Sequence, residues 1–429
     1  MSDEFKETLI GKIPKDWEIK ELGEVCTFET GKRMKGGALK EGEVFSLGGE
    51  HITDDGRIVF SPKKFVSLDF YKNLKKGRVS MYDVLMCKDG AKTGKVGLVR
   101  ELPYKYCAVN EHVYIIRSST KMLSNIYLFY FLHSKYGQEQ IRNYFHGLIG
   151  GITNKDIKSI KIPLPPLPEQ KKIAEILSTI DKAIEKTDAL IHHYQQLKNA
   201  LMQKLFTEGI GHTKFKSSPL GQIPVEWDVA KIGDIIEFAQ YGLSIKMYDE
   251  GQYPIVKMDS IVNGKVMPVN LKYVNLDEET FNKFKLEKGD VLVNRTNSYE
   301  LVGKTGIFML EGDYVFASYL IRLRPKRDIV DSVFLTYYLI LSQDRLRQIA
   351  TRGVSQANIN ATNLKKFLVP LPPLEEQKKI AQILMTIDNK IEAEMKTKEE
   401  LEKLKQGMMD KLLTGKVRVK VGEESGQKA

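Results

Sequence analysis

Cysteines and long uncharged runs are scarce in this sequence. Three cysteines, Cys26, Cys87 and Cys107, occur among 429 residues, and no two have Cys-x-x-Cys spacing. The sequence therefore supports neither a disulfide framework nor a cysteine zinc site, and it indicates a reducing compartment. Uncharged runs end at about 13 residues (122–134), whereas a membrane-spanning helix requires roughly 20. Because the N-terminus also lacks the apolar core of a secretory signal, we expect a cytoplasmic protein that makes no membrane contact.

Motifs that would indicate catalysis or metal binding are also missing. The seven histidines include no His-Glu-x-x-His motif, and the adjacent His192 and His193 would point to different faces of a helix. Gly303-Lys304-Thr305 is similar to the end of a phosphate-binding loop, but Ser298 stands where that loop requires glycine. The sequence has neither Gly-x-Ser-x-Gly nor the Asn-Pro-Pro-aromatic signature of amino-methyltransferases. We therefore expect no catalytic residue and no metal ligand in this chain.

The chain is a tandem repeat of two long units. Residues 162–187 and 369–394, which lie 207 positions apart, are identical at 18 of 26 aligned positions. Upstream, the segments that begin at Ile13 and Ile223 also match, and each contains a tryptophan four residues later. The ends of the units stay alike while their middles differ. This pattern indicates one shared mechanical role and two different binding surfaces, with neutral drift between the copies as the alternative.

Each unit begins with a mixed pattern of strands and helices and ends with a helical pattern. Short β-rich stretches, such as 109–116 and 314–323, and helical stretches at 125–144 and 333–350 predict compact α+β domains. A Pro-Leu-Pro-Pro segment ends each domain, because proline lacks the amide donor that a helix interior needs. The predicted boundaries are a globular domain at 1–165, a long helix at 166–208, a linker at 209–222, a second globular domain at 223–372, a second long helix at 373–414 and a flexible tail at 415–429.

Both long helices carry a heptad seam. Apolar residues recur in alternating steps of four and three after each proline-rich segment, with a few polar interruptions. The predicted seam residues are Ile173, Leu177, Ile180, Ile184, Ile191, Tyr194, Leu201, Leu205, Ile380, Leu384, Ile387, Ile391, Leu401, Met408 and Leu412. Residues 169–206 contain no proline or glycine, so the first helix would be a rod on the order of 57 Å long.

An apolar stripe of this length needs a partner, and the equivalent helix of the other unit is the obvious one. Two units related by a twofold axis would place the helices antiparallel. The predicted fold is therefore a pair of mixed α/β (α+β) globular domains joined by two long helices, which form an antiparallel coiled coil with a pseudo-twofold internal repeat. The alternative is that each helix packs separately on its own domain.

Basic residues lie beside glycines where loops are expected. The net charge of +11, from 66 Lys and Arg against 55 Asp and Glu, suggests a polyanionic partner. Glycine lets a loop approach a phosphodiester, Lys and Arg displace its counterions, and Arg and Asn can read guanine and adenine edges. The candidate DNA-binding residues are Lys32, Arg33, Lys35, Lys88, Lys92, Lys95, Asn154, Lys246, Arg295, Asn297, Lys304, Arg352, Gln356 and Asn358, and Asn294 and Asn360 are nearby amides. For any single residue, a solvated surface side chain is the alternative.

The doubled layout resembles one family. A tryptophan-containing start, a variable domain, Pro-Leu-Pro-Pro-Leu, Glu-Gln-Lys-Lys-Ile and a long helix occur twice, over about residues 10–415. This arrangement is similar to the specificity subunit of Type I restriction-modification systems. The resemblance implies that residues 13–160 and 223–368 are target recognition domains, each of which reads one half of a bipartite, asymmetric DNA sequence. The helices would fix the distance between the half-sites and dock methylation subunits.

The resemblance also implies which partners carry the chemistry. Such a chain is a non-catalytic subunit of a DNA adenine methyltransferase and restriction endonuclease complex, and it holds no cofactor. Its partners would be double-stranded DNA, two methylation subunits and the restriction subunits that translocate DNA, with S-adenosylmethionine, ATP and Mg²⁺ bound on those subunits. Two alternatives remain: a coiled-coil adaptor with two protein-binding domains and no DNA role, and an enzyme with an unrecognised site.

Overall fold

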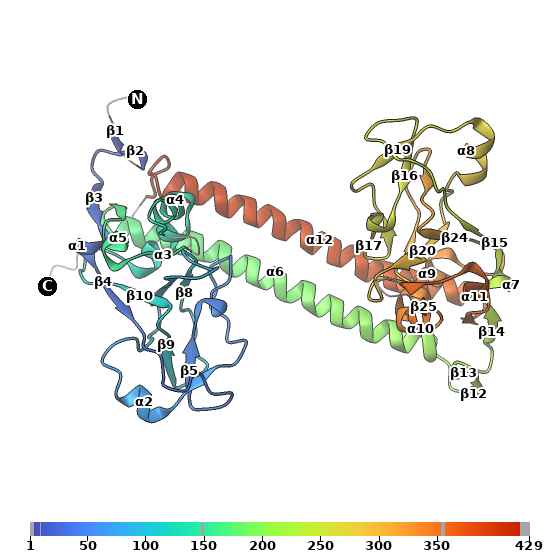
Figure 1. Cartoon of the computed structure of the whole chain (residues 1–429), viewed down its shortest axis with the longest axis horizontal. Coiled ribbons are helices and arrows are strands. Elements are labelled where there is room, and N and C mark those ends of the chain that lie inside the picture. Colours follow the sequence, from blue (N-terminus) through green and yellow to red (C-terminus); the bar gives the residue numbers. More distant parts are fainter. Residues whose placement is uncertain (1–3, 9, 147–149, 353–356, 421–429) are drawn as a thin grey trace. The chain divides into compact units, whose positions relative to one another are not determined.

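The computed structural model of the chain describes residues 4–8, 10–146, 150–352 and 357–420 (Figure 1). It divides into two compact units: unit 1 comprises Met1–Asp188 and Lys396–Ala429, and unit 2 comprises Ala189–Met395. Two long helices, α6 (Leu167–Thr207) and α12 (Leu374–Leu412), each contribute one end to each unit. Both units therefore contain a globular part and two helix segments, and each is described by itself.

The globular part of unit 1 is built on a four-stranded antiparallel sheet in the order β4-β10-β7-β8. A second sheet, β6-β5-β9, pairs β5 with β9 in parallel. Along the chain the elements are β1 (Phe5–Thr8), β2 (Gly11–Pro14), β3 (Glu18–Glu21), α1 (Leu22–Val25), β4 (Cys26–Thr30), β5 (Val44–Leu47), the 3-10 helix η1 (Gly49–His51), β6 (Phe65–Val66), α2 (Leu68–Lys72), β7 (Val84–Cys87), β8 (Val96–Leu98), β9 (Tyr106–Val109), β10 (Val113–Ser118), α3 (Asn125–His133), α4 (Lys135–Asn143), α5 (Asn154–Lys158) and β11 (Lys161–Leu164).

Strand β7 shows why the centre of this sheet is apolar at every position. Val84 and Met86 face one core cluster, which contains α3, while Leu85 and Cys87 face a second cluster around Phe45. Because successive side chains of a strand point to opposite faces, a strand covered on both sides reads as an uninterrupted apolar run. The same alternation between two clusters applies to Val291, Leu292 and Val293 of β20 (Val291–Asn294) in unit 2.

Unit 2 repeats this plan with a larger sheet, in the order β15-β24-β20-β22-β18-β17. Two three-stranded sheets, β19-β16-β23 and β21-β26-β25, accompany it. Along the chain the elements are β12 (Phe215–Ser218), β13 (Gly221–Pro224), β14 (Asp228–Lys231), α7 (Ile232–Ile235), β15 (Ile236–Tyr241), β16 (Tyr253–Val256), the 3-10 helix η2 (Met258–Ser260), β17 (Ile261–Val262), β18 (Lys265–Val266), β19 (Lys272–Val274), α8 (Glu278–Phe284), β20 (Val291–Asn294), β21 (Thr296–Asn297), β22 (Thr305–Ile307), β23 (Val315–Phe316), β24 (Leu320–Pro325), α9 (Ser332–Leu341), α10 (Gln343–Gln348), β25 (Thr351–Arg352), β26 (Ala357–Asn358), α11 (Ala361–Lys365) and β27 (Leu368–Leu371).

The helical stretch expected at 125–144 is two helices, α3 and α4. Ser134 ends α3 in an extended conformation, and its hydroxyl accepts a hydrogen bond from the amide of Gly137 (3.3 Å) at the start of α4. A serine cap of this kind competes with helix continuation. In unit 2 the stretch expected at 333–350 is likewise divided, at Ser342 between α9 and α10.

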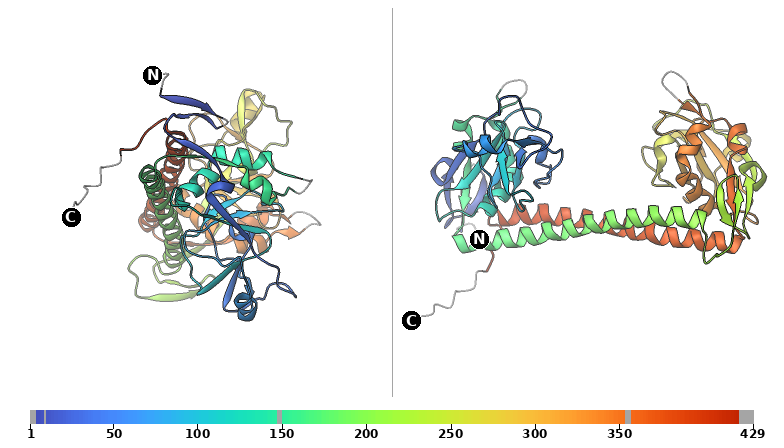
Figure 2. Two further views of the ribbon diagram at one scale, coloured as in Figure 1. Left: turned by 90° about the vertical axis from the view of Figure 1, so that its left-hand side faces the viewer. Right: turned by 90° about the horizontal axis from the view of Figure 1, so that it is seen from below.

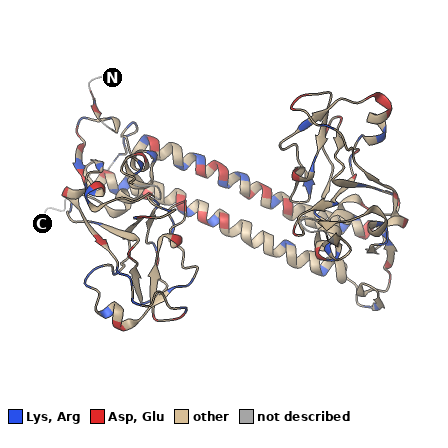
Figure 3. Ribbon diagram, in the orientation of Figure 1, with Lys and Arg blue, Asp and Glu red and all other residues tan. Residues whose placement is uncertain are grey.

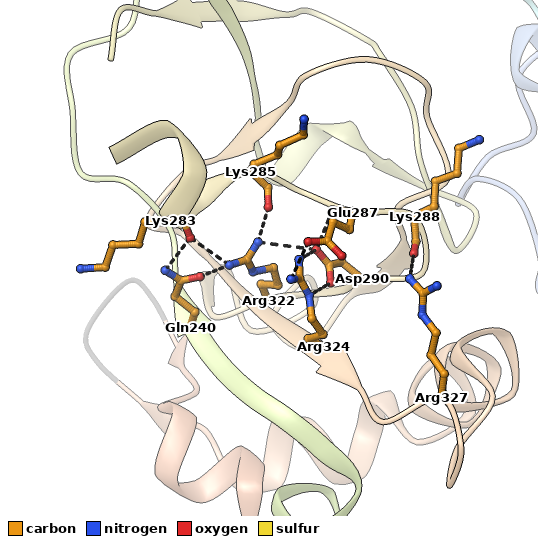
Figure 4. A network of polar contacts seen from close by, with 9 residues as sticks. All are labelled: Gln240, Lys283, Lys285, Glu287, Lys288, Asp290, Arg322, Arg324 and Arg327. Atoms are coloured by element: carbon orange, nitrogen blue, oxygen red, sulfur yellow. Dashed lines mark hydrogen bonds and ion pairs between the residues drawn. The ribbon is translucent and has the colours of Figure 1, made fainter. Parts of the chain in front are cut away.

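A buried arginine in unit 2 holds α8 against the sheet (Figure 4). The guanidinium of Arg322, in β24, donates to the main-chain oxygens of Lys283 (3.1 Å) and Lys285 (2.5 Å) at the end of α8. Its charge lies 3.6 Å from Asp290, which also accepts two 2.9 Å bonds from Arg324. Burial lowers the pKa of Arg322 to about 10 despite the charge of Asp290.

In each unit the two helix segments lie side by side and pack on the globular part (Figure 2). In unit 1, Ile173 and Leu177 of α6 and Leu412 of α12 belong to the same core cluster as Trp17. In unit 2, Leu205 of α6 and Ile380 of α12 belong to the cluster of the second tryptophan. Both helices are therefore anchored by the cores of both units, as well as facing each other.

An aspartate fixes the helix register in unit 1. Asp181 of α6 is 9% exposed at its side chain and lies 2.6 Å from the ammonium of Lys405 on α12. The same carboxylate accepts hydrogen bonds of 2.6 Å from Tyr130 of α3 and from Arg100. Because a buried charge is costly without its partner, the contact favours one alignment of the helices.

Unit 2 contains the counterpart of this contact, with the helices exchanged. Asp388 of α12 lies 2.6 Å from the ammonium of Lys198 on α6 and accepts a 2.5 Å bond from Tyr337 of α9. Each of these residues lies 207 positions from its counterpart (181 to 388, 198 to 405, 130 to 337). In both units the paired numbers sum to 586 (181 + 405, 198 + 388), as expected for antiparallel helices.

Removing one partner of the Asp181–Lys405 contact tests how much the contact contributes to the free energy of unfolding. Asp181→Ala leaves Lys405 and Arg100 without their carboxylate, and we expect it to reduce the free energy of unfolding by roughly 3 kcal/mol in urea titrations. The control is Glu399→Ala, which breaks an exposed 2.6 Å ion pair between Glu399 and Lys403, both on the α12 segment of unit 1. We expect no measurable change for the control, because exposed pairs are weak. Equal effects of the two substitutions would contradict the assigned role of Asp181.

Each tryptophan is joined to a long helix by a glutamate, which is buried in unit 1 and half-buried in unit 2. In unit 1 the indole of Trp17 donates to Glu169 of α6 (3.3 Å), and Arg418 donates to the same carboxylate at 2.8 and 2.9 Å. In unit 2 the indole of Trp227 donates to Glu376 of α12 (3.0 Å), and His212 lies 2.9 Å from it. The cation beside the glutamate is therefore an arginine in unit 1, which stays charged, and a histidine in unit 2, whose charge depends on pH.

This difference predicts a pH dependence. Burial lowers the pKa of His212, but its hydrogen bond to Glu376 and the charges of Glu376 and Glu226 outweigh that effect, so the pKa lies above the usual 6.5. A pKa that folding raises adds stability below the unfolded value, and this stability is lost as the pH rises through the folded value. We expect His212→Ala to lower Tm most below pH 6.5, with the deficit shrinking above it. Arg418→Ala, the control, should give a constant deficit over roughly pH 5.5 to 8.5, because arginine stays charged. A deficit for His212→Ala that does not vary with pH would contradict this assignment.

Candidate nucleic-acid interface

Three loops of unit 1 meet beside the same end of its sheet. The loop at 88–95 contacts the turn at 110–112, since the amide of Lys88 donates to the oxygen of His112 (2.8 Å) and the His112 ring lies 2.5 Å from Asp89. The loop at 150–154 joins them, because the amide of Ile152 donates to the oxygen of Lys88 (3.0 Å). The loops at 88–95 and 150–154, which both contain predicted DNA-binding residues up to 66 positions apart (88 to 154), therefore form one surface.

The predicted DNA-binding residues of unit 1 differ in their exposure and in their ion pairs. Lys32, Lys35 and Asn154 are exposed, and Lys92 is half-buried. Arg33 is 80% exposed at its side chain, 3.8 Å from Glu111 in the turn at 110–112. Lys95 forms an ion pair with Asp54, and Lys88 lies 3.9 Å from Asp89. Several of these charges are therefore partly balanced within the protein.

In unit 2, the predicted basic residue Arg295 is held by several contacts within the protein. Its guanidinium lies over the ring of Tyr241, 4.4 Å from the centroid. It donates at 3.4 Å to the main-chain oxygen of Ser318 and to the side chain of Asn358. Both bonds are long, and its Nε has no partner among the described residues. The side chain is thus held flat with donor capacity to spare.

Asn297 and Lys304 line a common hollow of about 660 Å³, together with Asn294 and Tyr319. Asn297 donates only to the sulfur of Met258 (3.4 Å), a weak acceptor. Lys304 has no ion pair within the described part of the chain, unlike Lys95 at the corresponding position of unit 1. The hollow, which is also lined by the ion pair of Lys257 and Asp259 (3.4 Å), therefore presents amides and a lysine that no carboxylate of the described residues contacts.

The other predicted residues of unit 2 lie apart or outside the description. Lys246 is exposed, with its ammonium 5.4 Å from the ring centroid of Tyr248. Gln356 lies outside the described residues, as does the side chain of Arg352. Asn360, a further amide, caps α11, since its side chain accepts from the amide of Asn363 (2.7 Å). Nothing in the local sequence around Tyr241 links it to Arg295, so this contact could not be predicted from the sequence.

Charged residues of both signs occur along α6 and α12 (Figure 3). Within the described ranges no group of three or more His, Cys, Asp or Glu side chains is arranged to hold a metal ion. Nor does any described helix have an apolar stretch long enough to cross a membrane. The three cysteines are buried and free, and burial raises the pKa of Cys87 and Cys107 to about 11 and that of Cys26 to about 12.

Comparison with known proteins identifies the family. A family model described as "Type I restriction modification DNA specificity domain" matches the chain twice, at residues 14–191 and 224–403. The chain is 31% identical to the Type I restriction enzyme MjaVIII specificity subunit of Methanocaldococcus jannaschii, covering 97% of each chain. It is 25% identical to the EcoKI specificity subunit of Escherichia coli, covering 87% of this chain and 82% of that one.

A solved structure shares the fold. The S subunit of a Type I restriction-modification system from M. genitalium matches with a TM-score of 0.61 at 17% identity, covering 92% of this chain and 96% of that one. The repeated α+β domains and paired long helices define a two-domain specificity subunit fold. The chain belongs to the family of Type I restriction-modification specificity subunits.

Proposed function

We propose that this chain is the sequence-specific DNA-binding subunit of a Type I restriction-modification complex. The observation that carries the proposal is that the DNA specificity domain matches twice, once over each copy of the repeat. Each target recognition domain, at about 1–165 and 223–372, would read one half of a bipartite target. Because the loops and charges of the two units differ, the half-sites would differ as well.

Several groups support DNA contact. In unit 1 the loops at 88–95 and 150–154 meet at one surface. In unit 2, Arg295, Asn297, Lys304 and Asn358 cluster around β21 and β26. Phosphate contacts from Lys and Arg would supply affinity, while amides and Arg295 would supply base readout. Two half-site contacts on one molecule would reinforce each other through their effective concentration.

We propose that α6 and α12, the helices expected at 166–208 and 373–414, set the gap between the half-sites. Their register is fixed by the Asp–Lys contact in each unit. Large apolar side chains remain exposed on the same helices, namely Leu190, Leu197, Ile383, Met385, Met395 and Leu404. Contiguous exposed apolar surface marks protein interfaces, and we assign these side chains to the docking of two methylation subunits.

The chain itself would catalyse nothing within the complex. Adenine methylation, with S-adenosylmethionine, would belong to the methylation subunits, and ATP- and Mg²⁺-dependent translocation and cleavage to the restriction subunits. The complex would act in the cytoplasm, where its substrate is double-stranded DNA.

Salt dependence tests the DNA role. For the chain assembled with its methylation subunits, we expect log K for duplex DNA to fall with log[salt] with a slope of several units. Lys304→Ala should reduce the slope by about one, because one phosphate contact is removed. Lys95→Ala should reduce it less, since Lys95 is already paired with Asp54.

The control is Lys12→Ala, which removes an exposed lysine that lies 3.3 Å from Glu7 in the β1-β2 hairpin, outside the proposed interface. Its slope should match that of the wild type. A flat salt response of the wild-type complex would reject the proposed function and favour the protein-binding adaptor.

A further inference from the structure

The side-chain amide of Asn294 is the most unusual polar group in unit 2. The residue ends β20 and is 1% exposed, and neither its Oδ1 nor its Nδ2 has a hydrogen-bond partner among the described residues. Its main chain is fully used, since its amide donates to Lys304 (2.8 Å) and its oxygen accepts from Gly303 (2.9 Å). The cost therefore falls on the carboxamide alone, because a buried polar group without a partner destabilises the fold.

Packing does not explain an asparagine here. Asn294 follows Leu292 on the face of β20 that contacts an apolar cluster with Phe316 and Leu320. The corresponding residue of unit 1 is Cys87, which is buried and whose thiol contacts the main-chain oxygen of Asp89 (3.4 Å). A small or apolar residue can therefore pack at this position, and packing does not account for the side-chain amide of Asn294.

The amide lines the hollow that also contains Asn297 and Lys304. The rim includes Tyr319, which is 47% exposed, and two methionines, Met247 and Met258. Methionine side chains are unbranched and adapt to a new neighbour. Met247 and Met258 line the hollow together with the amide and can move aside when a ligand enters. Lys257 and Asp259, which also line the hollow, pair with each other (3.4 Å), and Lys304 adds positive charge at the same opening. The ligand that fits is therefore an anionic polymer bearing planar polar edges.

We propose that Asn294 reads an adenine base in the half-site recognised by unit 2. A carboxamide offers one acceptor and one donor side by side, which matches N6–H and N7 of adenine. Lys304 contacts a neighbouring phosphate and holds the base edge at the hollow. The inference rests on the proposed function and adds to it a specificity-determining residue and the base that this residue reads.

The first test replaces the amide by an apolar group of similar size. The complex carrying Asn294→Leu is compared with the wild type on the cognate duplex and on duplexes with one base pair exchanged. We expect a loss on the order of ten- to hundred-fold on the cognate duplex, as for one bidentate base contact. Discrimination should vanish at a single A·T pair of the second half-site, while the first half-site serves as the internal control.

The stability of the variant separates readout from a structural role. If the amide has no partner in the free protein, Asn294→Leu leaves Tm unchanged or raises it. A lower Tm with unchanged discrimination would show that the amide is used in folding, for example by a buried water, and would overturn the proposal.

A second test leaves the protein unaltered. Replacing the adenine with 7-deazaadenine removes N7 as an acceptor but keeps the Watson–Crick pair. The wild-type complex should lose affinity with 7-deazaadenine at one position of the second half-site, whereas Asn294→Leu should be insensitive there. Equal sensitivity of the two proteins at every position would refute the role of Asn294. A wild-type complex that discriminates no sequence would instead refute the proposed function.

Discussion

An aspartate shared by two helices and a tyrosine, buried in unit 1 and half-buried in unit 2, is the contact on which each unit depends. Asp181 and Asp388 each accept from a lysine of the facing helix and from a tyrosine of the globular part. An apolar seam alone tolerates shifts of a heptad, whereas an ion pair at one seam position does not, because a shift would leave two charges buried and unpaired. The tyrosine adds a second condition, since it ties the aligned helices to the domain they support.

The repetitive features were open to prediction from the sequence because they rest on periodicity. The heptad spacing predicted two long helices, and the paired helices of the structure and its family matches confirm the fold class. The structure places the predicted seam residues in buried or half-buried positions, from Ile173 at the start of α6 to Leu412 at the end of α12. The lysines of the register contact appeared only as polar interruptions of the seam. Their aspartates could not be matched to them, because antiparallel pairing joins residues about 190 or 224 positions apart (388 − 198, 405 − 181).

The sequence indicates which residue types occur in the candidate interface, but not which contacts those residues make within the protein. Glycine-flanked lysines indicated loops, but the sequence does not reveal that Lys95 is balanced by Asp54 while Lys304 is not. Likewise Arg322 lies in a stretch that reads as a strand, and its burial beside Asp290 follows from the fold alone. Burial decides whether a polar side chain supports the protein or is left for a ligand, and burial depends on contacts between distant segments. Asn360, which caps α11, and Asn294, which has no partner in the described structure, illustrate the two cases.

The central claim is that the paired helices α6 and α12, held in one register, set by their length the gap of the recognised sequence. It is tested by deleting residues 189–195 of α6 together with residues 391–397 of α12, which removes one heptad from each helix and keeps the 188–398 ion pair in place. Seven residues correspond to about 10.5 Å of helix, or up to about three base pairs of B-DNA. Methylated adenines would be mapped by long-read sequencing in cells that express the variant with its partner subunits. The account predicts the same two half-sites with a shorter gap, and an unchanged gap would contradict it.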